Sequence, residues 1–334
     1  MAERSIIDQL DDAITEMIGA RQPDLTKLGT EASALAEVAR ELVGLPREAF
    51  KSELQQQLIR REQMSSSAEE SKKSAAEAGY VKEPEMRRKN RHAVTPYITV
   101  HQPAELIDFV TEAFGAIEHF RATGTVNGMH AEVSIGDSVM MIGGGEQIEP
   151  RPAAIHLYVP DVDQAYERAL KAGANSMMPV TDQPYGERSG SVEDVHGNRW
   201  YIATPFVPLE TIAKDLHTVT VYFHPIGAQG FIDFVTNAFD GKELMRHAEG
   251  DMIMHAKVQI GDSVIELGEA RNPTQPLPTA IYLYVDDVDA KYEQALQAGG
   301  VSMSEPADQV YGDRSAWVKD PFGNVWYVAA PIRK

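Results

Sequence analysis

Two stretches of this sequence are near copies of each other: HAEVSIGDSVMMIGG at residues 130–144 and HAKVQIGDSVIELGE at residues 255–269. In both, apolar and polar residues alternate ahead of an Ile-Gly-Asp turn, which predicts two strands joined by a tight turn. The copies start 125 positions apart. This repeat predicts that the chain contains two examples of one structural module.

The repeat extends on both sides of the hairpin. LIDFVTEAFGAIE matches FIDFVTNAFDGKE, and AIHLYVPDVDQAYERALKAGA from Ala154 matches AIYLYVDDVDAKYEQALQAGG from Ala280. YGERSG followed by GNRWYIAT matches YGDRSA followed by GNVWYVAA. We therefore predict a first module at residues 92–206 and a second at residues 216–334, with a short connector between them.

Each module divides again into two similar halves. A half begins with a short strand, continues with an amphipathic helix and ends with three strands, so that the order β-α-β-β-β occurs four times in the chain. This order predicts an α+β fold. We expect the two units of each module to form one curved mixed sheet, with helices on the outside and a binding cleft inside.

The chain ahead of the modules has a different character. Residues 1–64 carry apolar residues at helical spacing and are predicted to form a helical segment, whereas residues 65–91 have almost no large apolar side chain and are predicted to be a flexible, solvated linker. About 60 residues make a marginal core alone. We expect the helical segment to dock on itself, on the modules or on a second copy as a homodimer; partner docking is the alternative.

Composition excludes several classes of function. The 334 residues carry a net charge of -19 and include no cysteine, which excludes disulfides, thiolate metal sites and cysteine nucleophiles. The acidic balance argues against a general nucleic-acid binder. The N-terminus has no long apolar run, so we expect no membrane span and a cytoplasmic location.

The motifs resemble those of the vicinal oxygen chelate superfamily, in particular the glyoxalase/bleomycin-resistance proteins of the PhnB-like branch. The residues that carry the resemblance are Tyr97 in TPYITV, His130 in the first hairpin, HLYVPDVD from His156, and the YGERSG and GNRWYIAT segments with their second copies. The resemblance covers both modules and implies paired βαβββ units. It does not imply one activity, because the same scaffold serves lyases, epimerases, dioxygenases and metal-free drug-sequestering proteins.

The resemblance also implies where a divalent metal ion would bind. The corresponding positions lie at or beside Thr95, Met141, Ala154 and Tyr201 in module one, and Thr218, Glu266, Ala280 and Tyr327 in module two. Module one offers no set of ligands. In module two only Glu266 matches, with His217 one residue from an expected ligand, whereas three or four protein ligands are usual. We expect no metal in module one, a weak metal site at most in module two, and no other cofactor.

Other residues are candidates for binding a small-molecule ligand. Alternation places His156 on the same face as Tyr158, which makes His156 a candidate base or hydrogen-bond donor in the cleft, where module two has Tyr282. The remaining candidates are Tyr97, His130, Tyr185, Arg188, Tyr201, His255, Tyr311, Arg314 and Tyr327.

Several of these candidates have a structural alternative. Arg188 and Arg314 either meet an anionic ligand at the cleft mouth or brace the turn beneath them. His130 and His255 are expected to be structural histidines, and the neighbouring Glu132 and Lys257 are expected to be exposed. Each Trp-Tyr pair, such as Trp200 and Tyr201, should point to opposite faces, so one member faces the cleft and the other the core.

Two functions from different classes remain open. The first is a non-catalytic protein that binds a small apolar or aromatic molecule without the family's metal centre. The second is an enzyme, either a metal-dependent lyase, isomerase or dioxygenase that uses Glu266, or a metal-free enzyme in which His156 acts as a base. A third interpretation makes module one a structural partner of module two. We favour the binding protein.

Overall fold

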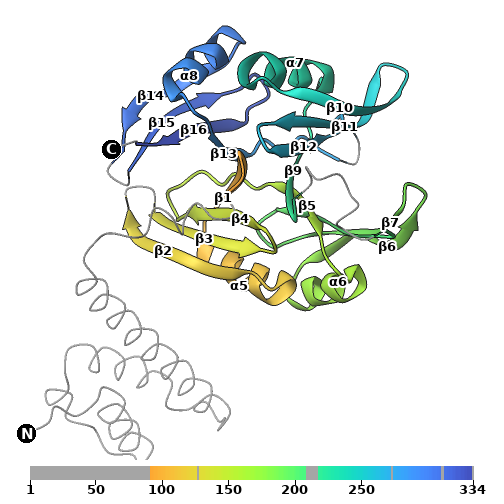
Figure 1. Ribbon diagram of the computed structural model, residues 1–334. Helices are drawn as coiled ribbons and strands as arrows, with labels where there is room; N and C mark the ends of the chain where they lie inside the picture. Colours follow the sequence, from red (N-terminus) through yellow and green to blue (C-terminus); the bar gives the residue numbers. More distant parts are fainter. Residues whose placement is uncertain (1–90, 126–127, 208–216, 272–273, 310–311, 333–334) are drawn as a thin grey trace, which may run out of the picture. The chain divides into compact units, whose positions relative to one another are not determined.

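The structure, a computed structural model, describes residues 91–125, 128–207, 217–271, 274–309 and 312–332 (Figure 1). The helical segment predicted at residues 1–64, its role in a homodimer and the linker predicted at residues 65–91 lie outside the described residues, apart from Arg91. No helix within the described ranges is long and apolar enough to cross a bilayer.

The two modules contain the expected order of elements, four times over. Module one consists of β1 (Val94–Val100), α5 (Pro103–Phe114), β2 (Ile117–Thr125), β3 (Gly128–Ile135), β4 (Ser138–Gly144), β5 (Ala154–Tyr158), α6 (Val162–Lys171), β6 (Asn175–Gln183), β7 (Glu187–Glu193) and β8 (Arg199–Pro205). Module two consists of β9 (Val219–Phe223), α7 (Ala228–Phe239), β10 (Lys242–Glu249), β11 (Met252–Ile260), β12 (Ser263–Leu267), β13 (Ala280–Tyr284), α8 (Val288–Gln297), β14 (Val301–Asp308), β15 (Asp313–Lys319) and β16 (Val325–Pro331). We number the units one to four in chain order.

The repeated Asp-Val-Asp motif starts the second helix of each module. Asp161 precedes α6 and its carboxylate accepts a hydrogen bond from the backbone N–H of Gln164; Asp287 does the same for Ala290 at the start of α8. Such caps satisfy N–H groups that the first turn of a helix leaves unpaired. The motif that carried the resemblance therefore has a local structural role.

The strands form two mixed sheets of eight strands each, which confirms the α+β class and the four units. Sheet one has the order β14-β15-β16-β13-β1-β4-β3-β2, and sheet two has the order β10-β11-β12-β9-β5-β8-β7-β6. Sheet one thus joins unit one to unit four, and sheet two joins unit three to unit two. The expectation that the two units of one module share a sheet is wrong: antiparallel pairs β1–β13 and β5–β9 connect different modules.

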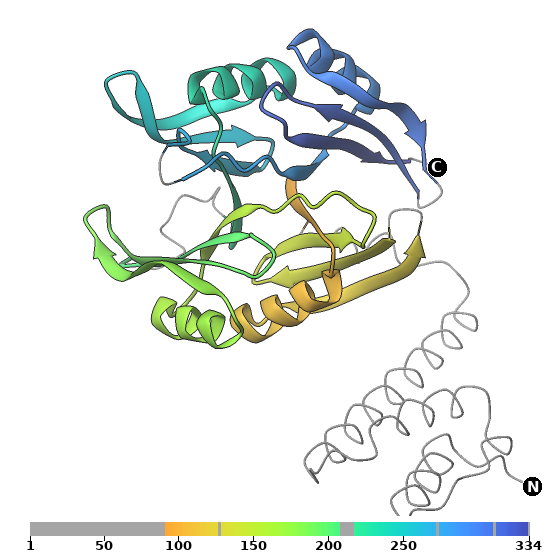
Figure 2. The ribbon, with the colours of Figure 1, turned by 180° about the vertical axis from the view of Figure 1, so that it is seen from behind.

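Helix packing explains this exchange of partners. Helix α5 packs against α6, and α7 packs against α8, on opposite sides of the molecule (Figures 1 and 2). Arg168 on α6 donates a hydrogen bond to the backbone carbonyl of Ala113 on α5 at 2.9 Å, and Lys291 on α8 forms an ion pair with Asp240 after α7. The two units of one module therefore contact each other through their helices. Their first strands pair with strands of the other module, as β1 does with β13 and β5 with β9.

A tryptophan stands at the centre of the core in each module. Trp200 contacts Phe109 and Phe114 of α5, and Trp326 contacts Phe223 and Phe239. Both indoles are fully buried, and each donates its Nε1–H to an aspartate carboxylate, Asp194 and Asp320 respectively. The neighbouring Tyr201 and Tyr327 point to the other face of the sheet, as alternation predicts.

Candidate functional site

Sheet one gathers aromatic side chains on the face opposite to its helices. On β1, Ile98 and Val100 belong to the main core, whereas Tyr97 belongs to a separate cluster on the other face. The rings of Tyr282 and Tyr327 are parallel with centroids 5.1 Å apart, and Tyr97 meets Tyr327 edge to face at 5.4 Å. We call this group the tyrosine face; its members are Tyr97, Tyr282, Tyr284, Trp317 and Tyr327.

The backbone of β4 lies close to the Tyr97 side chain because residue 143 is a glycine. A Cβ atom at Gly143 on β4 would lie 2.7 Å from the Tyr97 hydroxyl, so only glycine fits beneath this ring. Tyr97 is 8% exposed, and Met141 beside it is also buried. The sheet therefore holds the ring in one place by packing on both sides.

An ion pair lies beside the tyrosine face. Arg91 contacts the carboxylate of Glu132 at 2.5 Å and donates a hydrogen bond to the hydroxyl of Tyr284 at 3.0 Å. Glu132 is 6% exposed. The expectations that Arg91 ends a solvated linker and that Glu132 is exposed are both wrong, because each charge is neutralised by the other and withdrawn from water. His130 lies between them and Tyr97, with Nε2 3.8 Å from Glu132.

Sheet two carries charged residues at the matching positions. Glu266 on β12 is fully buried; its Oε2 lies 2.5 Å from Nδ1 of His156 on β5, and its Oε1 lies 3.0 Å from Nζ of Lys257 on β11. On the other side of the imidazole, Nε2 of His156 lies 3.8 Å from a carboxylate oxygen of Glu187. We call this group the ionic face; its members are His156, Glu187, Lys257 and Glu266.

Mutual attraction keeps the ionic face charged. Burial alone would raise the pKa of Glu266 and lower the pKa of His156, because it penalises both charged forms. The nearby imidazolium and the Lys257 ammonium outweigh burial and lower the pKa of Glu266 below its ordinary value. Glu266, with a contribution from Glu187, raises the pKa of His156. Lys257 was expected to be exposed, and the structure corrects this: its ammonium faces a buried carboxylate.

Two neutral tyrosine–histidine pairs border the ionic face. The hydroxyl of Tyr201 lies 2.8 Å from Nε2 of His224, and that of Tyr222 lies 3.3 Å from Nδ1 of His255. Burial lowers the pKa of His224 to about 4, with help from Arg199, and raises the pKa of Tyr201 to about 12. At neutral pH both partners of the Tyr201–His224 pair are therefore uncharged. Sequence reasoning missed His224, although alternation in VTVYFH places it on the same face as Tyr222.

The ionic face combines residues from both modules. His156 belongs to module one, whereas Lys257 and Glu266 belong to module two. Only the pairing of β5 with β9 brings them together, since β9 lies between β5 and β12. Sequence reasoning picked both His156 and Glu266 but assigned them to separate clefts.

Among the described residues, three ligand atoms of His, Asp or Glu lie within 4.8 Å of one another at His92, His217 and Asp262, outside both faces. On sheet one the family's ligand positions are held by Thr95, Met141, Ala280 and Tyr327, with no carboxylate or imidazole among them. On sheet two the Glu266 carboxylate is already neutralised by Lys257 and His156. His217, considered as a second ligand beside Glu266, lies instead against His92 and Asp262.

Arg188 and Arg314, which were predicted either to meet an anionic ligand or to brace a turn, are both paired with carboxylates of a neighbouring helix and strand. Arg188 contacts the carboxylates of Asp163 and Asp182, and Arg314 makes the equivalent contacts with Asp289 and Asp308, all between 2.6 and 2.9 Å. Tyr185 is 68% exposed on the loop before Arg188. Tyr311 lies outside the described residues.

The family follows from a comparison with known proteins. The sequence profile of the Glyoxalase/Bleomycin resistance protein/Dioxygenase superfamily matches residues 91–202 and 228–328, more than half of the chain. The chain belongs to this superfamily. The two matched segments coincide with the two modules that the internal repeat predicts.

Two relatives and one solved structure are similar to the chain. Mb0911c of Mycobacterium bovis and Rv0887c of Mycobacterium tuberculosis are each 35% identical to the chain over 128 residues, which is 34% of this chain and 83% and 74% of those proteins. Their names state no activity. The crystal structure of glyoxalase I from Zea mays is similar in fold, with a TM-score of 0.55 at 15% identity over 71% of this chain and 92% of that one.

Proposed function

We propose that this member of the superfamily binds a small planar aromatic molecule on the tyrosine face, without a divalent metal ion. The observation that carries the proposal is the convergence of Tyr97, Tyr282 and Tyr327 from three strands of sheet one. Aromatic rings that already pack in parallel and edge-to-face arrangements offer further faces and edges to a flat ligand. Tyr327 stands at one of the family's ligand positions, where a metal site would need an imidazole or a carboxylate.

The polar groups beside the tyrosine face favour a ligand with a hydrogen-bond acceptor. The indole N–H of Trp317 is buried and has no acceptor among the described residues. A buried donor without a partner costs free energy that a ligand oxygen would recover. The expected ligand is therefore a planar aromatic compound with a hydroxyl or carbonyl oxygen, such as a phenol.

The chemistry of sheet two supports independence from metal. A lysine ammonium and a divalent cation would compete for the same Glu266 carboxylate, and Lys257 already occupies that side at 3.0 Å. Metal binding there would require two adjacent cations in a buried site, which Coulomb repulsion opposes. His156 faces Glu266 as a third charged group.

Tryptophan fluorescence tests the proposal. The chain has three tryptophans, of which Trp200 and Trp326 are buried in the cores, so Trp317 reports on the tyrosine face. We expect 2-naphthol to change the emission of the full chain saturably, and Trp317→Phe to remove the signal. Tyr327→Ala should weaken binding at least about tenfold, which is about 1.4 kcal/mol.

The internal repeat supplies a matched control. Tyr201→Ala changes the equivalent position of sheet two and should leave the affinity for 2-naphthol within about twofold. No saturable response to 2-naphthol, or equal weakening by both alanine variants, would contradict binding at the tyrosine face.

A metal-dependent lyase, isomerase or dioxygenase is the second candidate, because Glu266 occupies a ligand position and faces His156. Native mass spectrometry after incubation with Zn²⁺, Ni²⁺ or Mn²⁺ tests it. One stoichiometric ion that is retained by the wild type and lost in Glu266→Gln would support the metalloenzyme. The same result would overturn metal independence.

A further inference from the structure

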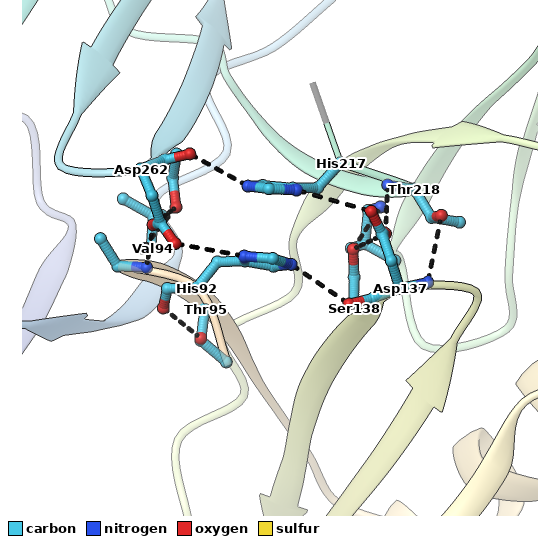
Figure 3. A network of polar contacts seen from close by, with 11 residues as sticks. His92, Val94, Thr95, Asp137, Ser138, His217, Thr218 and Asp262 are labelled. Carbon is cyan, nitrogen blue, oxygen red and sulfur yellow. Dashed lines mark hydrogen bonds and ion pairs between the residues drawn. The ribbon is translucent and has the colours of Figure 1, made fainter. Parts of the chain in front are cut away.

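Two histidines stack where the modules meet. The imidazole rings of His92 and His217 are nearly parallel, with centroids 3.3 Å apart (Figure 3). His92 precedes β1 and His217 precedes β9, so they occupy equivalent positions of the two modules. Neither residue belongs to the tyrosine face or the ionic face.

Each histidine is held by the hairpin turn of the other module. Asp262, in the β11–β12 turn of module two, accepts a hydrogen bond from the backbone N–H of Ala93 at 2.6 Å. Asp137, in the β3–β4 turn of module one, accepts one from Thr218 at 2.8 Å. The turns approach closely: a Cβ atom at Gly136 (φ +58°) would lie 2.4 Å from the Thr218 hydroxyl. The histidines are therefore confined by both turns.

All four ring nitrogens face acceptors. Nδ1 of His92 lies 3.4 Å from the Asp262 carboxylate, and its Nε2 lies 3.1 Å from the carbonyl oxygen of Asp137. Nδ1 of His217 lies 3.6 Å from the Asp137 carboxylate, and its Nε2 lies 3.0 Å from the carbonyl oxygen of Asp262. A neutral imidazole donates from one nitrogen only, whereas an imidazolium donates from both. Two neutral rings can serve two of these contacts, and two protonated rings can serve all four.

The arrangement suits protons better than a metal ion. His92, His217 and Asp262 bring one ligand atom each within 4.8 Å of one another. The two rings are parallel, however, so the nitrogens on the Asp262 side point side by side and not toward one central position. One ion in the plane of both rings would require the stack to open.

We propose that the His92–His217 stack, held between Asp137 and Asp262, is a proton-operated clasp that fastens module one to module two. Protonation of the pair completes the contacts to both turns, and deprotonation leaves nitrogen lone pairs facing acceptor oxygens. The clasp lies directly before β1 and β9, the strands that join the two halves of sheet one and sheet two. Its release loosens the junction of both sheets.

The charges around the clasp set the pH range. The carboxylates that face it are Asp137 and Asp262; the adjacent Arg91 directs its guanidinium to Glu132. The contact between His217 and Asp137 raises the pKa of His217. Burial would raise the pKa values of Asp137 and Asp262, but their hydrogen bonds across the junction lower both. The contribution of His217 to the stability of the junction is therefore complete below about pH 6.5 and disappears as the pH rises through the raised pKa of His217. The contribution of Asp137 and Asp262 to the stability of the junction is lost only at acidic pH, as the pH falls through their lowered pKa values.

Thermal unfolding of the full chain at several pH values tests the clasp. We expect the His92→Asn/His217→Asn variant to lose about 4 °C in Tm relative to wild type at pH 5.5 and about 1 °C at pH 8.5. His247→Asn removes an exposed histidine on β10 and is the matched control, with no pH-dependent difference. Equal losses by the double variant at both pH values would overturn the proposal.

A second measurement covers the case in which the double variant does not fold. Asp137→Asn retains the acceptor for Thr218 but removes the negative charge. In imidazole ¹H–¹⁵N spectra of the full chain we expect the titration midpoint of His217 to fall by about one pH unit in this variant. An unchanged midpoint would overturn the clasp. So would a rise in wild-type Tm with Zn²⁺ at pH 8.5 that the double variant lacks, because the pair would then hold a metal.

Discussion

The tyrosine face and the ionic face occupy equivalent positions on two sheets of the same topology, yet their chemistry is opposite. Four pairs of repeat positions account for the difference: Met141 and Glu266, Glu132 and Lys257, Tyr282 and His156, and Trp317 and Ser191. Sheet one keeps its centre aromatic and places the Arg91–Glu132 pair beside it. Sheet two buries its charges at the centre. A few side chains, and not the topology, therefore determine the chemistry of each face.

The comparison also shows that the fold does not require the buried charge. Met141 fills in sheet one the position that Glu266 fills in sheet two, and both are buried. A buried ion pair often contributes no more stability than an apolar pair of the same volume. Stability therefore gives no reason for sheet two to bury charges where sheet one buries an apolar side chain.

The largest expected effect comes from breaking the ionic face. Glu266→Gln removes the buried carboxylate that Lys257 and His156 share, and we expect a loss of about 3 kcal/mol in the free energy of unfolding at pH 7. Urea unfolding followed by circular dichroism measures it. The Lys257→Met/Glu266→Met variant, which removes both charges, should recover more than half of the loss. A double variant as unstable as Glu266→Gln would show that the charges themselves hold sheet two together.

The reverse exchange on sheet one should have a smaller effect. Met141→Glu places a carboxylate among tyrosines beside Glu132, and we expect a loss of about 2 kcal/mol at pH 7 that becomes smaller as the pH falls and the new group is protonated. Adding Glu132→Lys recreates the Glu–Lys pair of sheet two and should restore part of the stability. Urea unfolding at pH 7 and pH 5 distinguishes these cases. No recovery in the double variant would mean that the pair depends on more than these two positions.

The smallest effect on stability is expected at positions where module one and module two carry the same side chain. Arg188→Ala and Arg314→Ala remove equivalent exposed ion pairs, and exposed pairs contribute little to stability. We expect neither Tm nor 2-naphthol affinity to change beyond experimental error in either variant. A selective loss of ligand affinity in one of them would assign that arginine to a binding site and would favour the anion-binding interpretation over bracing.

Much of the structure can be predicted from local sequence patterns. Alternation correctly placed Trp200 and Tyr201 on opposite faces of the sheet, because neighbouring side chains of a strand face opposite ways. The same rule selected His156. The exposure of Glu132 and Lys257 was predicted wrongly. Alternation shows on which face of the sheet a residue lies, but it does not show whether an oppositely charged side chain lies beside it.

The sequence by itself determined the repeat, the four βαβββ units, their turns and helix caps, and the face on which each strand residue lies. These features depend on neighbours within a few positions, and such interactions are encoded locally. Only the tertiary structure decided which units share a sheet, and with it the ionic face and the His92–His217 clasp. The four units present similar strand edges, so the sequence does not distinguish one partner from another. Packing of α5 on α6 and of α7 on α8 makes that choice, and it brings residues more than 100 positions apart, such as His156 and Glu266, into contact.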